Sequence, residues 1–245
     1  MAYLQILGTG PSTPITDGVG RNYRRRSSAL MNHISCYFML DVTHDFDEQV
    51  EMALSVTAAA VTNSSRDAAG GLGNLDKWTE HPLPLHVPRA LYEELEERYG
   101  PFEKIFHVPT PAGQATDVGE MKVTPFVVET SSGEDGRSTF GYHFDTGKKR
   151  VCYASDLKFI PPESEQYFQN NDLLIVDGAG WDKDLPTHRG ALNHIHQYAA
   201  WKNDRIIFTH IGRSAPPHSQ ASTSVRRMHH LADVAFDEMK LPLGR

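Results

Sequence analysis

Side chains that can bind metals or transfer protons follow apolar runs of the chain at four places. These are Asp41 after 36–40, Asp67 in the polar stretch after 58–62, Asp156 after 151–155 and His210 after 206–209. If the apolar runs are strands, the sheet holds each backbone rigid while the following loop aims the side chain. Two or more carboxylates with an imidazole at neighbouring strand ends are typical of a metal-dependent hydrolase.

Apolar periodicity predicts the elements that would position these groups. Expected strands cover 3–7, 36–40, 58–62, 84–87, 122–129, 139–145, 151–155, 173–177, 205–209 and 234–241. Expected helices cover 89–99, 162–170 and 190–201, with a short helix ending at Trp78. Strands come first, β/α alternation follows, and no linker or repeat interrupts them. This order predicts one domain, residues 1–245, with two sheets and helices outside them.

Composition excludes several classes of protein. The chain has 24 Lys and Arg against 31 Asp and Glu, a formal charge of −7, which argues against a nucleic-acid partner. No apolar run is long enough to span a membrane, and two cysteines, Cys36 and Cys152, are too few for a disulfide framework. We therefore expect a cytoplasmic protein with a small-molecule substrate. The oligomeric state is left open, a homodimer included.

Short motifs spread over nearly the whole chain carry a family resemblance. They are Leu7-Gly8-Thr9-Gly10, Arg24-Arg25-Arg26-Ser27-Ser28, Leu40-Asp41, Tyr153-Ala154-Ser155-Asp156, Leu174-Ile175-Val176-Asp177, His188 and Phe208-Thr209-His210-Ile211. In this order they resemble the metallo-β-lactamase superfamily, most nearly tRNase Z and the cyclic phosphodiesterase of the carbon-phosphorus lyase pathway. The resemblance implies an α/β (α+β) fold, a four-layer αββα sandwich, and hydrolysis of a phosphodiester or related ester.

The metal-binding signature of that family is degenerate in this chain. The signature H-x-H-x-D-H falls on residues 63–68, where Asn63, Ser65 and Ala68 replace its histidines and Asp67 is kept. Thr130 stands where the family has another histidine. This chain keeps two other ligands of the family, the bridging carboxylate, Asp156, and the last histidine, His210.

The retained ligands all belong to one half of the family's two-metal site. The resemblance therefore implies that Asp67, Asp156 and His210 hold at most one divalent ion. This oxygen-rich set is closer to a manganese, iron or weak zinc site than to a tight zinc site. His188 matches the family's substrate-contacting histidine, and we expect His188 and Asp67 to be catalytic. Expected contacts with a phosphate-containing substrate are His188, Arg26, Asn63, Ser65 and Thr130.

Two other functions stay open at this point. A metal-free member of the fold would bind or transform a biosynthetic intermediate with Asp156, His188 and His210 as acid and base groups. An inactive partner subunit would also account for the lost ligands. At the level of single residues, Asp67 could simply be the N-cap of a following helix, and Arg26 could lie in a solvated loop that pairs with surface acids.

Overall fold

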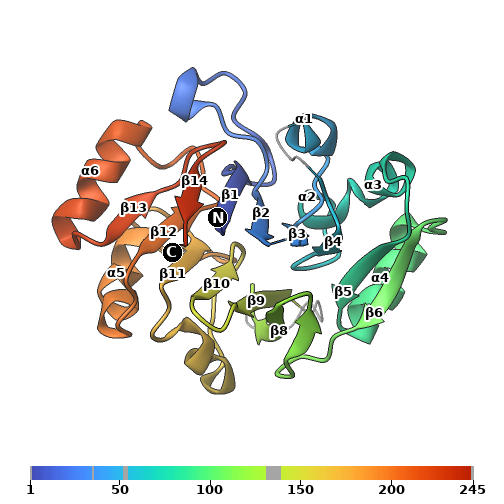
Figure 1. Cartoon of the computed structure of the whole chain (residues 1–245). Helices are drawn as coiled ribbons and strands as arrows, with labels where there is room; N and C mark the ends of the chain where they lie inside the picture. The colour runs from blue at the N-terminus through green and yellow to red at the C-terminus, as the bar shows by residue number, and fades with distance from the viewer. Residues whose placement is uncertain (1, 35, 52–54, 131–138, 244–245) are drawn as a thin grey trace.

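Two seven-stranded mixed sheets form the centre of the computed structural model, which describes residues 2–34, 36–51, 55–130 and 139–243 (Figure 1). The first sheet has the order β14-β1-β2-β3-β4-β5-β6, and the second has the order β13-β12-β11-β10-β9-β8-β7. The strands of the first sheet are β1 (Tyr3–Gly8), β2 (Ser28–His33), β3 (Cys36–Leu40), β4 (Ala58–Ala60), β5 (Leu83–Val87), β6 (Ile105–Pro109) and β14 (Lys240–Pro242). Those of the second are β7 (Thr116–Val118), β8 (Met121–Val128), β9 (Thr139–Asp145), β10 (Arg150–Ala154), β11 (Leu173–Asp177), β12 (Ile206–Thr209) and β13 (Ala232–Val234).

Strands β10, β11 and β12 of the second sheet are apolar on both faces, because both faces are covered. In β10, Val151 and Tyr153 join the core shared with the first sheet, whereas Cys152 and Ala154 join the core under the outer helices. Successive side chains of a strand point to opposite faces, so the two cores alternate along the strand. This explains why β10 reads as a continuous apolar run and not as an alternating one.

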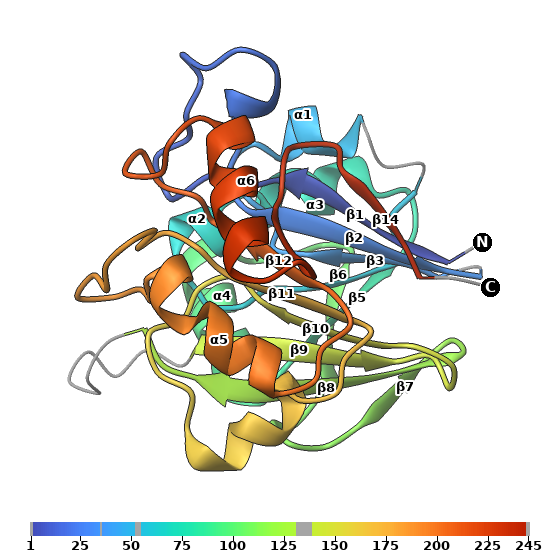
Figure 2. The same ribbon diagram turned by 90° about the vertical axis from the view of Figure 1, so that its left-hand side faces the viewer.

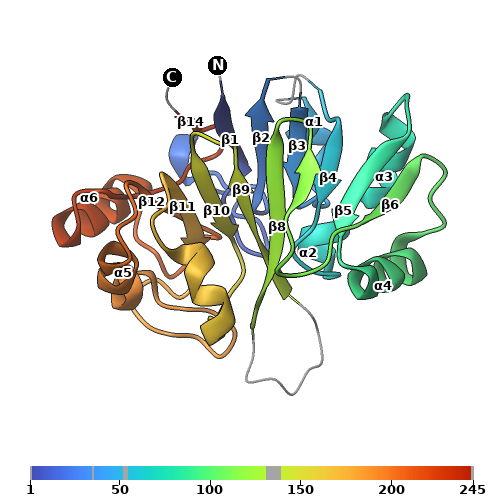
Figure 3. The ribbon, with the colours of Figure 1, turned by 60° about the horizontal axis from the view of Figure 1, so that its bottom comes forward.

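Helices cover the outer face of both sheets, and Figure 3 shows α5 and α6 on the opposite side of the molecule from α3 and α4. The helices are α1 (Phe46–Val50), α2 (Arg66–Ala69), α3 (Leu72–Trp78), α4 (Arg89–Tyr99), α5 (Ala191–Ala200) and α6 (His218–Met228), with 3-10 turns η1 (Gly20–Asn22) and η2 (Pro162–Phe168). The expected four-layer αββα sandwich is confirmed. No helix within the described part of the chain is long and apolar enough to cross a membrane.

Two of the predicted elements differ from the structure, and other elements, β2, β6, β7, α1 and α6 among them, were not predicted. The expected strand 234–241 is wrong: β13 pairs with β12 in the second sheet, the chain turns at Glu238 with φ of 72°, and β14 pairs with β1 in the first. The expected helix 162–170 is the 3-10 segment η2. Helix α6 was not predicted, because only Ala221 and Val225 of its polar sequence mark a buried face.

The chain turns sharply where β3 and β12 end. Asp41 follows β3 with φ of 60°, and His210 follows β12 with φ of 56°. Left-handed backbone is uncommon outside glycine and is found where the surrounding structure enforces it, most often near functional sites. The two chain termini lie together at the other end of the sheets (Figure 2). The turns therefore mark one end of the sandwich as the place to look for a site.

Candidate functional site

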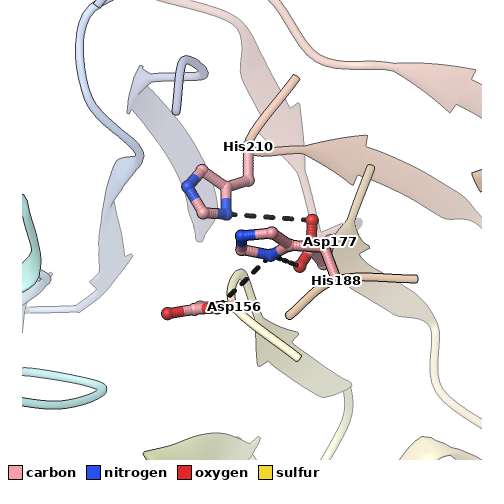
Figure 4. A group of neighbouring side chains, drawn as sticks. All are labelled: Asp156, Asp177, His188 and His210. Atoms are coloured by element: carbon pink, nitrogen blue, oxygen red, sulfur yellow. Dashed lines mark hydrogen bonds and ion pairs between the residues drawn. The ribbon is translucent and has the colours of Figure 1, made fainter. Parts of the chain in front are cut away.

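Four side chains converge where three neighbouring parallel strands end (Figure 4). Asp156 follows β10, Asp177 is the last residue of β11, His210 follows β12, and His188 lies between β11 and α5. One ligand atom from each of these residues lies within 4.8 Å of those of the others. Parallel strands place their carboxyl ends at the same sheet edge, so residues 156, 177 and 210 meet although they are far apart in the sequence.

Asp177 orients His188. The Asp177 carboxylate is buried, and its Oδ2 lies 2.6 Å from Nδ1 of His188. The same oxygen accepts the backbone N–H of Leu157 at 3.1 Å, and Oδ1 accepts that of Ala179 at 2.8 Å. Both oxygens are thus engaged by the protein, which fixes the carboxylate and, through it, the His188 ring. Burial lowers the pKa of His188, but the hydrogen bond and charge of Asp177, with the charges of Asp156 and Asp67, raise it to about 9.

Asp156 is the least satisfied carboxylate of the group. Its Oδ2 accepts the side-chain N–H of Asn63 at 3.1 Å, but its Oδ1 makes no hydrogen bond within the described residues. The Oδ1 atom lies 3.5 Å from Nδ1 of His188. Burial raises the pKa of Asp156 to about 6, against the opposing effect of the His210 charge. A buried oxygen without a partner is costly, and it is expected where a ligand completes the site.

Asp67, Asp156 and His210 line one small cavity of about 10 Å³, together with Asn63 and Ala68. This volume is on the order of the space needed for one water. Nδ1 of His210 also makes no hydrogen bond within the described residues. Asp67, Asp156 and His210 thus offer two carboxylates and one imidazole, and Asp156 and His210 each have a buried atom without a partner among the described residues. This set fits a single cation better than a two-metal site. The Asp67 carboxylate lies outside the tight group of four, where Asp177 takes its place.

Other residues expected at the site are placed differently. Arg26 donates its guanidinium N–H groups to Asp45 and to the backbone oxygen of Ser12, so the guanidinium is already bound by other residues of the protein. Neither Arg26 nor Thr130 is among the described residues that line the small cavity. The Ser65 hydroxyl is buried without a hydrogen-bond partner in the described structure, next to that cavity's wall at Asn63. The geometry of the small cavity therefore does not support Arg26 and Thr130 as substrate contacts, which the sequence had suggested.

The N-cap interpretation of Asp67 is wrong. Ser65 occupies the N-cap position of α2, and Asp67 lies inside the first helical turn. A carboxylate there is favourable toward the positive end of the helix dipole and leaves its oxygens free to face the cavity.

The sequence placed Asp177 in a motif of the family resemblance but gave it no specific role in the site. A carboxylate that ends the fully buried run Leu173–Val176 was the available signal, because a buried charge in a strand needs a partner. The partner, His188, is 11 residues away along the chain, and no periodicity connects the two.

Asp41 is a further carboxylate that lines the small cavity, and its side chain is buried. Its Oδ1 accepts the backbone N–H of Thr62 at 2.7 Å, and its Oδ2 accepts the hydroxyls of Tyr153 at 3.1 Å and Ser155 at 3.2 Å. Burial raises the pKa of Asp41 to about 7, although these three hydrogen bonds act to lower it. The hydrogen bonds of Asp41 connect the end of β3 to β10, and burial gives this carboxyl group a pKa near neutrality.

Asp41 should make folding stability depend on pH. Between its usual pKa of 3.8 and the folded value of about 7, the unfolded chain releases a proton that the folded protein keeps. The stabilisation is complete below the lower value and is lost as pH rises through the upper one, by roughly 4 kcal/mol in total. We expect Asp41→Asn to lack this loss, so that the stability of the wild type relative to the variant falls between pH 4 and pH 8.

Urea unfolding of both proteins across this range measures the difference, and contributions of other groups cancel in it. Parallel stability curves for the wild type and Asp41→Asn would show that Asp41 does not titrate in this way.

Comparisons with known proteins agree with this architecture. The family model described as "Beta-lactamase superfamily domain" matches residues 19–211. A diphosphatase of the PhnP family has a TM-score of 0.84 at 23% identity, with 100% of this chain and 98% of that chain covered. Zn²⁺-bound PqqB of Methylobacterium extorquens has a TM-score of 0.80 at 16% identity, covering 98% and 100% of the two chains. Human tRNase Z, short form, has a TM-score of 0.73 at 15% identity, covering 99% and 100%.

One curated relative matches over a part of its length. The octanoyltransferase of Porphyromonas gingivalis is 24% identical over 234 residues, covering 88% of this chain and 47% of that protein, so the chain spans about half the length of this relative.

The family model covers more than half of the chain and includes α2, β11, His188 and His210, which carry much of the site. The structural neighbours share the two-sheet architecture over nearly their whole length. The resemblance inferred from the strand-end motifs is therefore confirmed at the level of the superfamily. The chain belongs to the beta-lactamase superfamily and has the metallo-β-lactamase fold.

Proposed function

We propose that this protein hydrolyses a phosphodiester or a related ester of a small, phosphate-containing molecule. The observation that carries the proposal is the Asp177–His188 pair, which lies directly beside Asp156 and His210 (Figure 4). A fixed imidazole next to a cluster of possible metal ligands is a combination that can catalyse ester hydrolysis. The names of two structural neighbours, a PhnP-family diphosphatase and a tRNase Z, support a phosphate ester as the substrate class.

Asp67, Asp156 and His210 are the residues that would hold a metal ion, proposed to be a single Mn, Fe or Zn. When bound, such an ion supplies Lewis-acid polarisation of the phosphoryl group and a bound water of lowered pKa. The side-chain N–H of Asn63 already covers one oxygen of Asp156. A second ion would need a ligand atom with a free lone pair at position 63, which the histidine of the family signature supplies. Asn63 instead directs an N–H group at Asp156, which supports one ion and not two.

His188 is proposed as the general acid. Its Nδ1 is held by Asp177, which leaves Nε2 without a hydrogen bond among the described residues. A proton on Nε2 can pass to the leaving-group oxygen as the ester bond breaks, and the Asp177 carboxylate stabilises the charged ring before that transfer. Asp177 acts through His188, so it is a positioning residue in this proposal.

Turnover of bis(p-nitrophenyl) phosphate before and after chelation tests the proposal. We expect purified protein from metal-supplemented medium to hydrolyse the diester, to lose at least nine-tenths of its rate in EDTA, and to recover with Mn²⁺, Fe²⁺ or Zn²⁺. Absence of turnover under all metals would contradict the proposal.

The metal-free function is the second candidate, favoured by the Asn63–Asp156 hydrogen bond that takes up one carboxylate oxygen. In it, Asp156 and His188 act as the base and acid of a non-hydrolytic reaction. Activity or ligand binding that survives EDTA unchanged would support this function over the first.

The remaining expectations stay predictions. They are the single domain over residues 1–245, the cytoplasmic location and the substrate contacts of Arg26, Ser65 and Thr130.

A further inference from the structure

A second, larger cavity lies between α6, the η1 segment and the chain that follows β13, a region seen in Figure 2 where the η1 loop lies above α6. Its volume is about 460 Å³, and its polar lining includes Arg21, His218, Ser219, Arg226 and Asp233, with Phe236 as an aromatic wall. None of the residues that line it also lines the small cavity at Asp156. It is therefore a separate place on the molecule.

Hydrogen-bond donors outnumber acceptors in this cavity. The Arg21 guanidinium lies 4.1 Å from the centroid of the Phe236 ring and has no acidic or hydrogen-bonding partner among the described residues. Arg226 pairs with Asp233, and Asp233 also accepts the hydroxyl of Ser222. The one carboxylate that lines the cavity is thus already used, whereas most N–H groups of the two guanidinium ions, both exposed to solvent, have no partner among the described residues. An acceptor-rich, negatively charged ligand would balance the set.

His218 gives independent support. Its side chain lines the cavity and is 5% exposed, yet neither Nδ1 nor Nε2 has a hydrogen-bond partner among the described residues. Its backbone N–H donates to Oδ1 of Asn22 at 2.8 Å, which fixes the ring at the first turn of α6. A buried imidazole with two unused nitrogens is costly, and its usual explanation is a ligand or ordered water that the ring contacts.

The electrostatic surroundings of His218 favour an anion. Burial and the positive charges of Arg24 and Arg21 lower its pKa, which disfavours the charged form of the ring. The start of the 11-residue helix α6 adds the positive end of its dipole to the same region.

We infer that the cavity at Arg21, His218 and Arg226 is a second binding site, for a phosphate-class anion. The guanidinium groups would bind the anion oxygens. The nitrogens of His218 are buried against the protein, so a small rotation of the ring on binding would let its N–H donate to one of those oxygens. The site does not depend on the proposed hydrolysis, because it shares no lining residue with the metal-binding cavity.

Calorimetric titration of the full chain with inorganic phosphate and with phenyl phosphate tests this inference, each on metal-loaded protein and on protein stripped of metal with EDTA and then desalted to remove the chelator. We expect one equivalent to bind in both conditions, because chelation leaves this cavity intact. Binding that persists without a metal and is weakened by the Arg21 and Arg226 variants described below reports the new site and not the cavity at Asp156. Tighter binding of phenyl phosphate would identify a phosphate ester as the ligand, and equal binding would identify the free anion.

Arg21→Gln and Arg226→Gln should each weaken phosphate binding at least 10-fold, the second also because it leaves Asp233 uncompensated. Arg21→Lys should restore part of the affinity. The matched control is Arg227→Gln, an exposed arginine on the same helix that does not line the cavity, and it should bind as the wild type does. The ring ¹⁵N signals of His218, assigned with His218→Gln, should move on phosphate addition.

Three results would overturn the inference. They are no binding of phosphate to the metal-stripped protein, equal weakening in Arg227→Gln, and His218 ring signals that do not respond to a saturating anion. The last result would mean that only water fills the hydrogen-bonding capacity of His218. None of these results bears on the phosphodiester proposal, which Asp156 and His188 variants test separately.

Discussion

His188→Gln is expected to lower kcat for phosphodiester hydrolysis by about 10²–10⁴-fold, with KM nearly unchanged. Glutamine can keep a hydrogen bond to the buried Asp177 carboxylate, but it cannot transfer a proton to a leaving group. The loss therefore falls on the transition state and not on binding. Steady-state kinetics on bis(p-nitrophenyl) phosphate, with metal content measured in the same samples, gives the two effects separately.

The matched control is His196→Gln, because His196 is an exposed histidine on α5 outside the cluster. It should change kcat by less than about 3-fold, as surface substitutions usually do. Asp177→Asn should lower kcat in the same direction as His188→Gln, with KM unchanged, since it removes the group that orients the ring. A His188→Gln protein with more than half of the wild-type kcat would exclude His188 as the general acid.

Asp156→Asn is expected to have the second largest effect, on metal affinity. Substitution of residues that only orient metal ligands costs about 10–100-fold in affinity, so removal of a carboxylate ligand should cost at least about 100-fold. Asparagine keeps the volume of Asp156 and removes a charge that burial makes unfavourable, so the fold should be retained. Equilibrium dialysis against Mn²⁺ and Zn²⁺, with thermal unfolding of the same protein, separates lost ligation from lost structure.

Asp117→Asn serves as the control for this measurement. Asp117 forms an exposed ion pair with Lys122, away from the site, and its substitution should leave metal content unchanged. If Asp156→Asn binds as much metal as the wild type, Asp156 is not a ligand, and the metal-dependent function loses its main support.

The sequence predicted those parts of the fold that local pattern determines. The strands 36–40, 139–145 and 173–177 and the helix 89–99 match β3, β9, β11 and α4 to the residue. Each has an apolar run or a helical stripe bounded by a clear stop, such as Gly100 after α4. The switch from β13 to β14 was missed because a short turn at Phe236–Glu238 interrupts apolar residues that belong to different sheets.

The site was predictable only in part, for a physical reason. Asp156 and His210 end strands, so their placement follows from the sheet, and the structure brings both to one edge. The role of Asp177 depends on a side-chain contact with His188 that no spacing rule contains. The engagement of Arg26 by Asp45 likewise follows from tertiary packing, because the two residues come from different loops.

The metal centre is tested most directly by the crystal structure of protein purified from metal-supplemented medium, with anomalous scattering recorded at the Mn, Fe and Zn edges. The proposed function predicts one anomalous peak in the small cavity, at bonding distance from Asp67, Asp156 and His210. A cavity without any anomalous peak, or two peaks bridged by Asp156, would contradict it.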